Sequence, residues 1–364
     1  MRILHVIGGL NRGGAETWLV QTLRHIDRTK YQFDFLVHTE QPCAYDDEVR
    51  SLGARIIACL SPSDPVRYTR NFLRILRETG PYDCVHSHVH RFSGYVLTLA
   101  RLAGVRVRIT HSHTTDKERE NRRQFYRLAM TNLLKIGATA GLAVSDKAAT
   151  SLFGENWKTD PKWRVSHLGI DLEPFARPVD SHKLRAELGI PVQAFVIGHV
   201  GRFAPPKNHT FLLDIAKHVC ATNVEAIFVL VGDGPFRNAM EIKAEKLGIS
   251  QHVKFAGNRD DVAQLMKGVM DVFLFPSLYE GFPLALLEAQ AAGLRCFITD
   301  TISAETDILP QLVTRLSLED SAGAWAESVN RGQPSTERCF QPDAMRDFSI
   351  DAAVSRLCNV YDEE

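Results

Sequence analysis

Short apolar runs alternate along this chain with longer stretches whose apolar residues follow a helical spacing. A run that is apolar throughout predicts a strand buried on both faces, as in a parallel sheet covered by helices. In the first half of the chain such runs lie at residues 3–7, 33–38, 56–60, 84–88, 105–111, 141–145 and 164–168. In the second half they lie at 195–200, 226–231, 253–256, 272–275, 296–299 and 313–316.

The intervals between these strands carry amphipathic helical patterns. They lie near residues 15–27, 66–79, 92–103, 117–136 and 146–153, and then near 208–221, 236–247, 260–268, 283–292 and 321–330. Regular alternation of strands and helices predicts an α/β protein made of two doubly wound, Rossmann-like domains with parallel sheets.

The same pattern suggests the domain boundaries. We expect one domain over residues 1–172 and a second over 173–345, joined by a linker at 171–180 that contains two prolines. A last helix is expected within 346–364, with Ser349 as its N-cap.

Composition narrows the class of protein further. Of the 364 residues, 45% are hydrophobic and 24% are charged, as in soluble globular proteins. No apolar run reaches the length of a membrane-spanning helix, and the N-terminal residues read as a strand rather than a signal peptide. Seven scattered cysteines without a Cys-x-x-Cys pair argue for a reducing compartment and against a zinc site or disulfide framework. We therefore expect a cytoplasmic protein.

Charge is balanced overall but unevenly distributed. Residues 1–175 hold 25 Lys and Arg against 18 Asp and Glu, and the remaining residues hold 18 against 25. The basic half is expected to face something anionic, and no nucleic-acid partner is expected.

Helix 117–136 could lie on the cytoplasmic face of an anionic membrane, although an ordinary surface helix has the same pattern. Its cations are Lys117, Arg119, Arg122, Arg123, Arg127 and Lys135.

Two glutamates, Glu280 and Glu288, flank the start of the helix that is predicted after the strand at 272–275. Pro283 suits the first helical position, which places Glu280 in a loop at the carboxyl end of the strand and Glu288 inside the helix. An anion is stabilised by the N–H groups at such a helix start. These N–H groups belong to Gly281, Phe282 and Leu284. A phosphate flanked by two carboxylates that bind sugar hydroxyls points to a nucleotide sugar.

A second loop supplies positive charge. The strand at 195–200 ends in a loop that carries Arg202 and Lys207, and a pyrophosphate leaving group needs such cations. Solvated surface cations would give the same pattern. Asn258 and Arg259, after the third strand of this domain, are candidates for contacting the nucleotide base.

In the first domain, Gly13 and Gly14 open a helix and allow the backbone to approach an anion. Their spacing disfavours a dinucleotide site, and no P-loop sequence occurs. No Asp-x-Asp pair that could clamp a metal diphosphate occurs either.

Two His-Ser-His sequences end strands of the first domain. They contain His86, His88, His111 and His113. Side chains at i and i+2 share one face of a strand, so these histidines could resemble metal ligands. Because cysteine and carboxylate partners at metal spacing are missing, we expect hydrogen bonding to sugar hydroxyls instead, and neither a metal nor another cofactor.

Taken together, these motifs resemble the retaining glycosyltransferases of family 4, which have the GT-B fold of two Rossmann-like domains facing a cleft. The resemblance extends over nearly the whole chain and is strongest to bacterial members that build exopolysaccharide or capsule. The residues that carry it are Gly13, Gly14, Ala15, Glu16, Gly201, Arg202, Phe203, Lys207, Asn208, His209, Glu280 and Glu288.

The resemblance implies roles for the matching positions. Glu288 would bind the ribose hydroxyls, and Glu280 would contact the donor sugar. His111 matches the active-site histidine of the family, although the nearby His113 leaves the assignment open. The diphosphate would be held by Arg202, Lys207, Gly13, Gly14, Gly281, Phe282, Leu284 and the backbone around Pro283. No metal would be required, and the last helix would return to the first domain. A departure at residues 303–305 leaves the role of Glu305 open.

The implied reaction moves a sugar from a UDP- or GDP-sugar to a saccharide or lipid-linked acceptor, with retention of anomeric configuration. The catalytic residues would be Glu280, His111, Arg202 and Lys207, with His86, His88 and His113 on the acceptor side. Two alternatives stay open: a nucleotide-sugar 2-epimerase of similar fold, and a non-catalytic protein that binds nucleotide sugars. The intact acidic and basic motif residues argue against the second.

Overall fold

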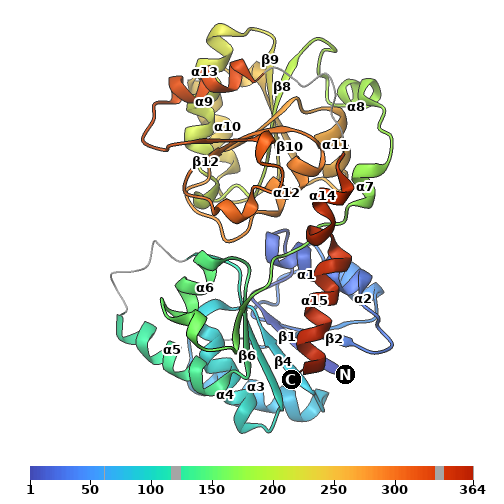
Figure 1. Cartoon of the computed structure of the whole chain (residues 1–364), viewed down its shortest axis with the longest axis vertical. Coiled ribbons are helices and arrows are strands. Elements are labelled where there is room, and N and C mark those ends of the chain that lie inside the picture. The colour runs from blue at the N-terminus through green and yellow to red at the C-terminus, as the bar shows by residue number, and fades with distance from the viewer. Residues whose placement is uncertain (61, 116–123, 333–339, 364) are drawn as a thin grey trace. The chain divides into compact units, whose positions relative to one another are not determined.

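The computed structural model describes residues 1–60, 62–115, 124–332 and 340–363 (Figure 1). The chain divides into two compact units: unit 1 comprises Met1–Gly169 with Ile350–Glu364, and unit 2 comprises Ile170–Ser349. Each unit contains one parallel sheet with helices packed on it, as the alternating pattern predicts. Within the described ranges, every helix is too short or too polar to cross a lipid bilayer.

Seven parallel strands form the sheet of unit 1, in the order β3-β2-β1-β4-β5-β6-β7. Their bounds are β1 Arg2–Ile7, β2 Gln32–Val37, β3 Arg55–Ala58, β4 Cys84–Ser87, β5 Val107–Ser112, β6 Ala140–Ala143 and β7 Trp163–Val165. Every strand predicted for this half of the chain is present. The central strands β1 and β4 are almost wholly buried because helices cover both of their faces.

The helices of unit 1 lie on both sides of this sheet. Figure 1 shows α3, α4 and α5 on one side and α1 and α15 on the other. Local chemistry sets where they begin: in α3, the Asp64 side chain accepts a hydrogen bond of 3.0 Å from the Arg67 N–H, and Pro65 occupies the first turn. The bounds are α1 Gly14–His25, α2 Asp46–Ser51, α3 Pro65–Thr79, α4 Ser93–Leu102, α5 Gln124–Gly137, α6 Asp146–Phe153 and α15 Ile350–Glu363.

The C-terminal helix α15 packs against α1 in unit 1. The Tyr361 hydroxyl lies 2.8 Å from Nδ1 of His86 on β4, and Nζ of Lys30 lies 2.7 Å from the Asp362 carboxylate. The expected return of the last helix to the first domain is therefore confirmed.

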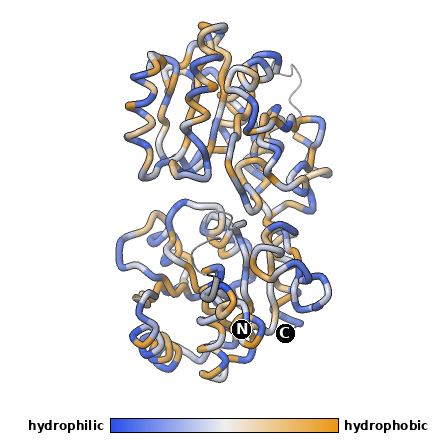
Figure 2. Tube along the Cα trace, turned by 90° about the vertical axis from the view of Figure 1, so that its left-hand side faces the viewer, coloured by the Kyte–Doolittle hydropathy of each residue, from blue (hydrophilic) through white to orange (hydrophobic). Residues whose placement is uncertain are grey.

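Unit 2 has six parallel strands in the order β10-β9-β8-β11-β12-β13. Their bounds are β8 Phe195–Val200, β9 Ala226–Val231, β10 Val253–Gly257, β11 Val272–Phe275, β12 Arg295–Thr299 and β13 Val313–Leu316. The helices are α7 Glu173–Ala176, α8 Ser181–Glu187, α9 His209–Thr222, α10 Arg237–Lys246, α11 Val262–Gly268, α12 Leu284–Ala291, α13 Ala322–Arg331 and α14 Pro342–Met345. In Figure 2 the helices alternate between hydrophobic and hydrophilic positions, as one-sided burial requires.

The predicted linker is packed onto unit 2 rather than extended. It contains the short helix α7, whose Phe175 is buried. Lys267 of α11 donates hydrogen bonds to the carbonyls of Phe175 and Arg177. Although this segment was predicted as a linker, Pro174 lies in the first turn of α7, where its missing N–H removes no helical hydrogen bond.

Candidate active site

Two loops of unit 2 meet where the chain order of the sheet reverses. The strands β8 and β11 are neighbours in the sheet, and helices follow both at their carboxyl ends, which is where open α/β sheets bind ligands. The Leu278 N–H donates to the Pro206 carbonyl at 2.8 Å, and the Asn208 amide donates to the Pro276 carbonyl at 3.1 Å. Asn208 has a positive φ of 53°, which asparagine tolerates better than most residues.

The predicted Lys207 and Glu280 face each other across these loops. Lys207 Nζ lies 2.7 Å from Glu280 Oε1, and both side chains are largely buried. The same ammonium lies 4.6 Å from the centre of the Phe275 ring, an attractive cation–π contact. Lys207 is therefore fixed in place before any ligand arrives.

Arg202 differs from Lys207. Its side chain is exposed, and it makes no hydrogen bond or ion pair with any residue that the structure describes. Its position is nevertheless fixed through its neighbours, because Phe203 is fully buried and its N–H donates to the Asp233 carbonyl at 3.0 Å. In this loop Lys207 is thus paired with Glu280, whereas the Arg202 side chain is available to bind an anion.

The helix start beside Glu280 differs from the prediction by one residue. Pro283 is the N-cap of α12 rather than its first helical residue, because its ψ of 104° is extended. The N–H groups of Leu284 and Ala285 therefore open the helix without an intrahelical partner. Gly281, Phe282, Pro283 and Leu284 are all buried, so this end of the helix is screened from bulk water.

Glu288 lies one turn further along α12. Burial raises the pKa of its carboxyl to about 7. Among the described residues no side chain or N–H donates a hydrogen bond to it, although it keeps some exposure to solvent. A carboxylate in this state gains most from a ligand that brings hydroxyl donors.

Two further loops support this edge of the sheet. The Gly232 N–H donates to the Gly257 carbonyl at 2.8 Å, and a Cβ at Gly232 would lie 2.2 Å from the Gly201 carbonyl oxygen. Gly232 also has a φ of 128°, so only glycine fits this position without strain.

The predicted base contacts are less distinctive. Asn258 is exposed, and Arg259 forms a two-pronged ion pair with Asp261 at 2.7 and 2.6 Å.

Gln290 of α12 has a supporting role that the sequence analysis missed. Its buried amide donates to the carbonyls of Leu286 and Thr306, at 3.1 and 2.8 Å, and its oxygen accepts from the Leu309 N–H at 2.8 Å. It therefore ties α12 to the loop after β12. Glu305 in that loop accepts a hydrogen bond of 2.7 Å from the Ser303 hydroxyl.

Replacing Gln290 with leucine is expected to destabilise unit 2 by about 3 kcal/mol, because two buried backbone groups lose their partners. Urea denaturation of the variant and the parent protein measures this difference. Gln251→Leu, at an exposed position, is the matched control and should change the unfolding free energy little. Equal stability of Gln290→Leu and the parent would contradict the supporting role.

The glycine loop of unit 1 opens α1 as predicted. Gly13 is the N-cap, with extended backbone and no side-chain hydrogen bond, and Gly14 is the first helical residue. A Cβ at Gly14 would meet no atom within 4 Å, while one at Gly13 would lie 2.4 Å from the Glu16 carboxylate. Glu16 therefore folds back over the loop at the start of the helix.

The four predicted histidines come together at the carboxyl edge of unit 1. His86 and His111 lie on the neighbouring strands β4 and β5, with parallel rings 5.4 Å apart, and both are fully buried. His88 Nδ1 lies 2.9 Å from His113 Nε2. Burial lowers the pKa of all four, so the rings are neutral at pH 7.

A fifth histidine, His5 on β1, joins this group and was not predicted. Its Nδ1 lies 3.0 Å from His88 Nε2, and β1 pairs with β4 so that His5 is opposite His86. A doubly wound sheet places β1 beside β4, the strand that carries the first His-Ser-His sequence. This strand order could have predicted that His5 joins the group. Trp18 of α1 meets the His111 ring edge-on at 5.3 Å and links the histidines to the helix that follows the glycine loop.

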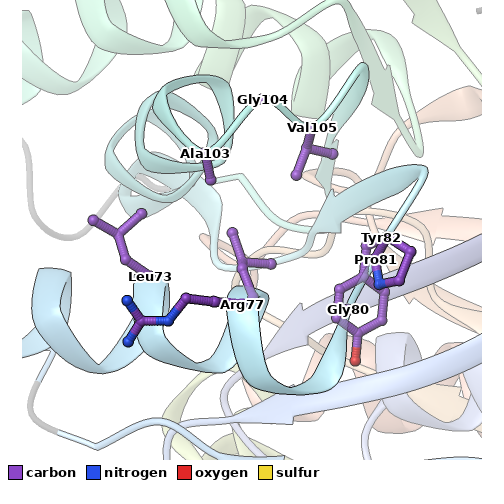
Figure 3. A pocket seen from close by; sticks show the side chains of 9 residues that line it. Leu73, Arg77, Gly80, Pro81, Tyr82, Ala103, Gly104 and Val105 are labelled. Carbon is purple, nitrogen blue, oxygen red and sulfur yellow. The ribbon is translucent and has the colours of Figure 1, made fainter.

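A surface groove of about 620 Å³ lies elsewhere on unit 1 (Figure 3). Its lining includes Arg77 of α3, Tyr82 before β4 and Val105 before β5. These residues precede their strands, so the groove is at the sheet edge opposite to the histidines. It holds none of the predicted site residues.

Of the predicted membrane-facing helix, the structure describes α5, which begins at Gln124. Lys117, Arg119, Arg122 and Arg123 lie outside the described residues. On α5 itself, Leu128 and Ile136 are exposed, and Lys135 lies beside Ile136 on the exposed side.

Comparisons with known proteins identify the family. A family model described as "Glycosyltransferase Family 4" matches residues 12–174, and one described as "Glycosyl transferases group 1" matches residues 180–332. EpsF of Bacillus subtilis (strain 168), named as a glycosyltransferase, is 39% identical and covers 99% of this chain and 96% of its own length. This chain belongs to glycosyltransferase family 4. It is an enzyme of the glycosyltransferase class, and the epimerase and non-catalytic alternatives are not favoured.

Other matches agree with this family. CapH of Staphylococcus aureus, a capsular polysaccharide biosynthesis glycosyltransferase, is 27% identical over 99% of this chain and 98% of its own. A galactosyltransferase of Escherichia coli is 31% identical over 60% of this chain and 58% of its own. HepE of Anabaena has a similar structure, with a TM-score of 0.82, 19% identity and full coverage of both chains. The GT-B fold and the likeness to exopolysaccharide and capsule enzymes are confirmed.

Proposed function

We propose that this family 4 glycosyltransferase moves a sugar from a UDP- or GDP-sugar to a saccharide or lipid-linked acceptor, with retention of configuration. The observation that carries the proposal is in unit 2. There Lys207, paired with Glu280, lies at the switch point of the sheet. The next loop leads into the start of α12 and to Glu288, whose carboxyl has no hydrogen-bond partner among the described residues. This set provides a cation, N–H donors and a hydroxyl-binding carboxylate on one edge.

Relatives support the substrate class. HepE has been crystallised with UDP-glucose, and with UDP and glucose. The Escherichia coli relative is a UDP-Gal:alpha-D-GlcNAc-diphosphoundecaprenol alpha-1,3-galactosyltransferase, whose acceptor is lipid-linked. CapH acts in capsular polysaccharide biosynthesis. We therefore propose synthesis of a cell-surface polysaccharide on the cytoplasmic side of the membrane.

In the proposed mechanism the departing diphosphate is stabilised as its charge grows. Lys207, Arg202 and the N–H groups at the start of α12 supply that stabilisation, and Glu288 holds the ribose. Glu280, beside Lys207, contacts the donor sugar. The acceptor attacks on the face that the diphosphate leaves, and a phosphate oxygen takes its proton. On the acceptor side, His111 or His113 positions the sugar, and no metal is needed.

A donor panel tests the proposal. Purified protein is incubated with UDP- and GDP-sugars, with and without saccharide and undecaprenyl-diphosphate-sugar acceptors, and products are resolved by mass spectrometry and by NMR of the anomeric proton. Transfer with retained configuration supports the proposal. Epimerised donor without transfer, or binding without any turnover, would contradict it.

The exposed apolar residues of α5 support peripheral contact with an anionic membrane. Replacing both Leu128 and Ile136 with aspartate is expected to lower binding to vesicles that contain anionic lipid at least several-fold, because the apolar anchor is lost and negative charge is added. Vesicle flotation at low salt measures the fraction of protein that is bound. Val224→Asp, at an exposed apolar position of unit 2, is the control. Equal flotation of all three proteins, or none by the parent, would refute the contact.

A further inference from the structure

Five histidines of unit 1 form a cluster that the proposed transfer reaction does not fully use. We call it the histidine cluster; its members are His5, His86, His88, His111 and His113. Two overlapping triads have one ring nitrogen per residue within 4.8 Å of one another. One triad is His5, His86 and His88, and the other is His88, His111 and His113.

Several ring nitrogens of the cluster are buried without a hydrogen bond. Both nitrogens of His111, which is fully buried, and Nδ1 of His113 find no partner among the residues that the structure describes. Each such group costs about 1–3 kcal/mol when it stays unsatisfied. A ligand that accepts the lone pair of one His111 nitrogen would lower this cost.

We propose that His88, His111 and His113 bind one divalent transition-metal ion of the Zn²⁺ type. Three neutral imidazoles form the ligand set of open zinc sites, in which water or a substrate oxygen takes the fourth position. Imidazole nitrogens select Zn²⁺, Co²⁺, Ni²⁺ and Cu²⁺ over Mg²⁺ and Ca²⁺, which prefer oxygen ligands.

This triad is favoured over the other because an ion can reach it. His88 and His113 are partly exposed, whereas His5 and His86 are fully buried and Nδ1 of His86 faces the Tyr361 hydroxyl. The ion would replace the contact of 2.9 Å between His88 Nδ1 and His113 Nε2.

His5 would then act as a positioning residue. With the ion on Nδ1 of His88, the ring proton is on Nε2 and is donated to His5 Nδ1, 3.0 Å away. Such a bond to the second nitrogen fixes the tautomer and orientation of a ligand histidine.

Metal binding does not depend on the proposed function, but its expected effect on transfer does. An ion on His111 would block the approach of this residue to the donor sugar or acceptor. Zn²⁺ should therefore inhibit transfer, and a chelator should restore it. Tight Zn²⁺ binding without inhibition would support the metal site and contradict the role of His111 in transfer.

The test uses untagged, chelator-treated full-length protein. Calorimetry with Zn²⁺ and visible absorption with Co²⁺ should show one ion per chain, with the intense bands of four-coordinate Co²⁺, and no binding of Mg²⁺. His88→Ala and His113→Gln should each weaken Zn²⁺ binding more than about 100-fold, and His5→Phe about 10- to 100-fold. Circular dichroism and binding of UDP-sugar confirm that each variant is folded.

The matched control is His209→Gln in unit 2. His209 is also buried, and neither of its ring nitrogens has a partner in the part of the chain that the structure describes, but it belongs to neither triad. It should bind Zn²⁺ like the parent protein. Unchanged Zn²⁺ affinity in His113→Gln, which remains informative if His88→Ala does not fold, would overturn the proposal. So would an equal loss of affinity in His209→Gln.

Discussion

Replacing Lys207 with alanine is expected to lower the turnover number of sugar transfer by about 100- to 1000-fold, the usual effect of removing one group that stabilises transition-state charge. The structure holds this ammonium beside Glu280 and over the Phe275 ring, so it is positioned before the donor binds. Charge on the diphosphate grows as the glycosidic bond breaks. The affinity for the intact donor should therefore fall much less than the turnover number.

Steady-state kinetics with the donor found by the panel measures both quantities. The matched control is Lys243→Ala, since Lys243 lies in the same unit and pairs with Asp214 at 2.7 Å, outside the site. The control should keep nearly full turnover. If Lys207→Ala turned over at the rate of the parent, the leaving-group role of this residue would be refuted. Arg202→Ala is expected to act in the same direction.

Glu288→Gln is expected to have two opposite effects: loss of donor affinity and a gain in the stability of unit 2. The carboxyl at this position has a pKa of about 7 because burial disfavours its charged form. In the unfolded chain the same carboxyl has an ordinary pKa of 4.5. The native state therefore holds a proton between pH 4.5 and 7 that the unfolded state has released.

The sign of the stability effect follows from this difference in bound protons. The free energy of unfolding falls as pH rises from 4.5 to 7, and the loss is complete above 7. A shift of this size corresponds to a stability loss on the order of 3 kcal/mol. Glutamine carries no charge, so at pH 8 the variant should melt several degrees above the parent. At pH 4, below the pKa of the carboxyl in both states, the two should melt together.

Donor binding has the opposite pH dependence. Ribose hydroxyls donate to the ionised carboxylate, so the affinity of the parent for a UDP- or GDP-sugar should fall up to about tenfold per pH unit below 7. A nucleotide sugar is used rather than a nucleoside diphosphate because its pyrophosphate does not titrate near pH 7. Calorimetry at pH 6 and 8 measures this change. A Glu288→Gln variant that bound the donor like the parent at pH 8 would contradict the ribose contact.

Much of the fold was predictable because hydrophobic periodicity is a local property. All thirteen expected strands are present, and the Arg202–Lys207 and Glu280–Gly281 loops follow the expected strands. Four short helices in the described ranges, α2, α7, α8 and α14, were not predicted, because they are too short to show a clear helical period. The start of α12 was misplaced by one residue because Pro283 suits the N-cap as well as the first turn.

The candidate site was only partly predictable, because its chemistry depends on residues distant in the sequence. The sequence motifs identified Lys207, Glu280 and Glu288 as site residues. They did not predict that Lys207 and Glu280 form an ion pair. The sequence by itself determined the two α/β units, the loops at their strand ends and the family. Tertiary structure decided the raised pKa of Glu288, the bonds of Gln290 and the addition of His5 to the histidines. Desolvation and hydrogen bonding depend on which strands become neighbours, and a local pattern of polar and apolar residues does not contain that information.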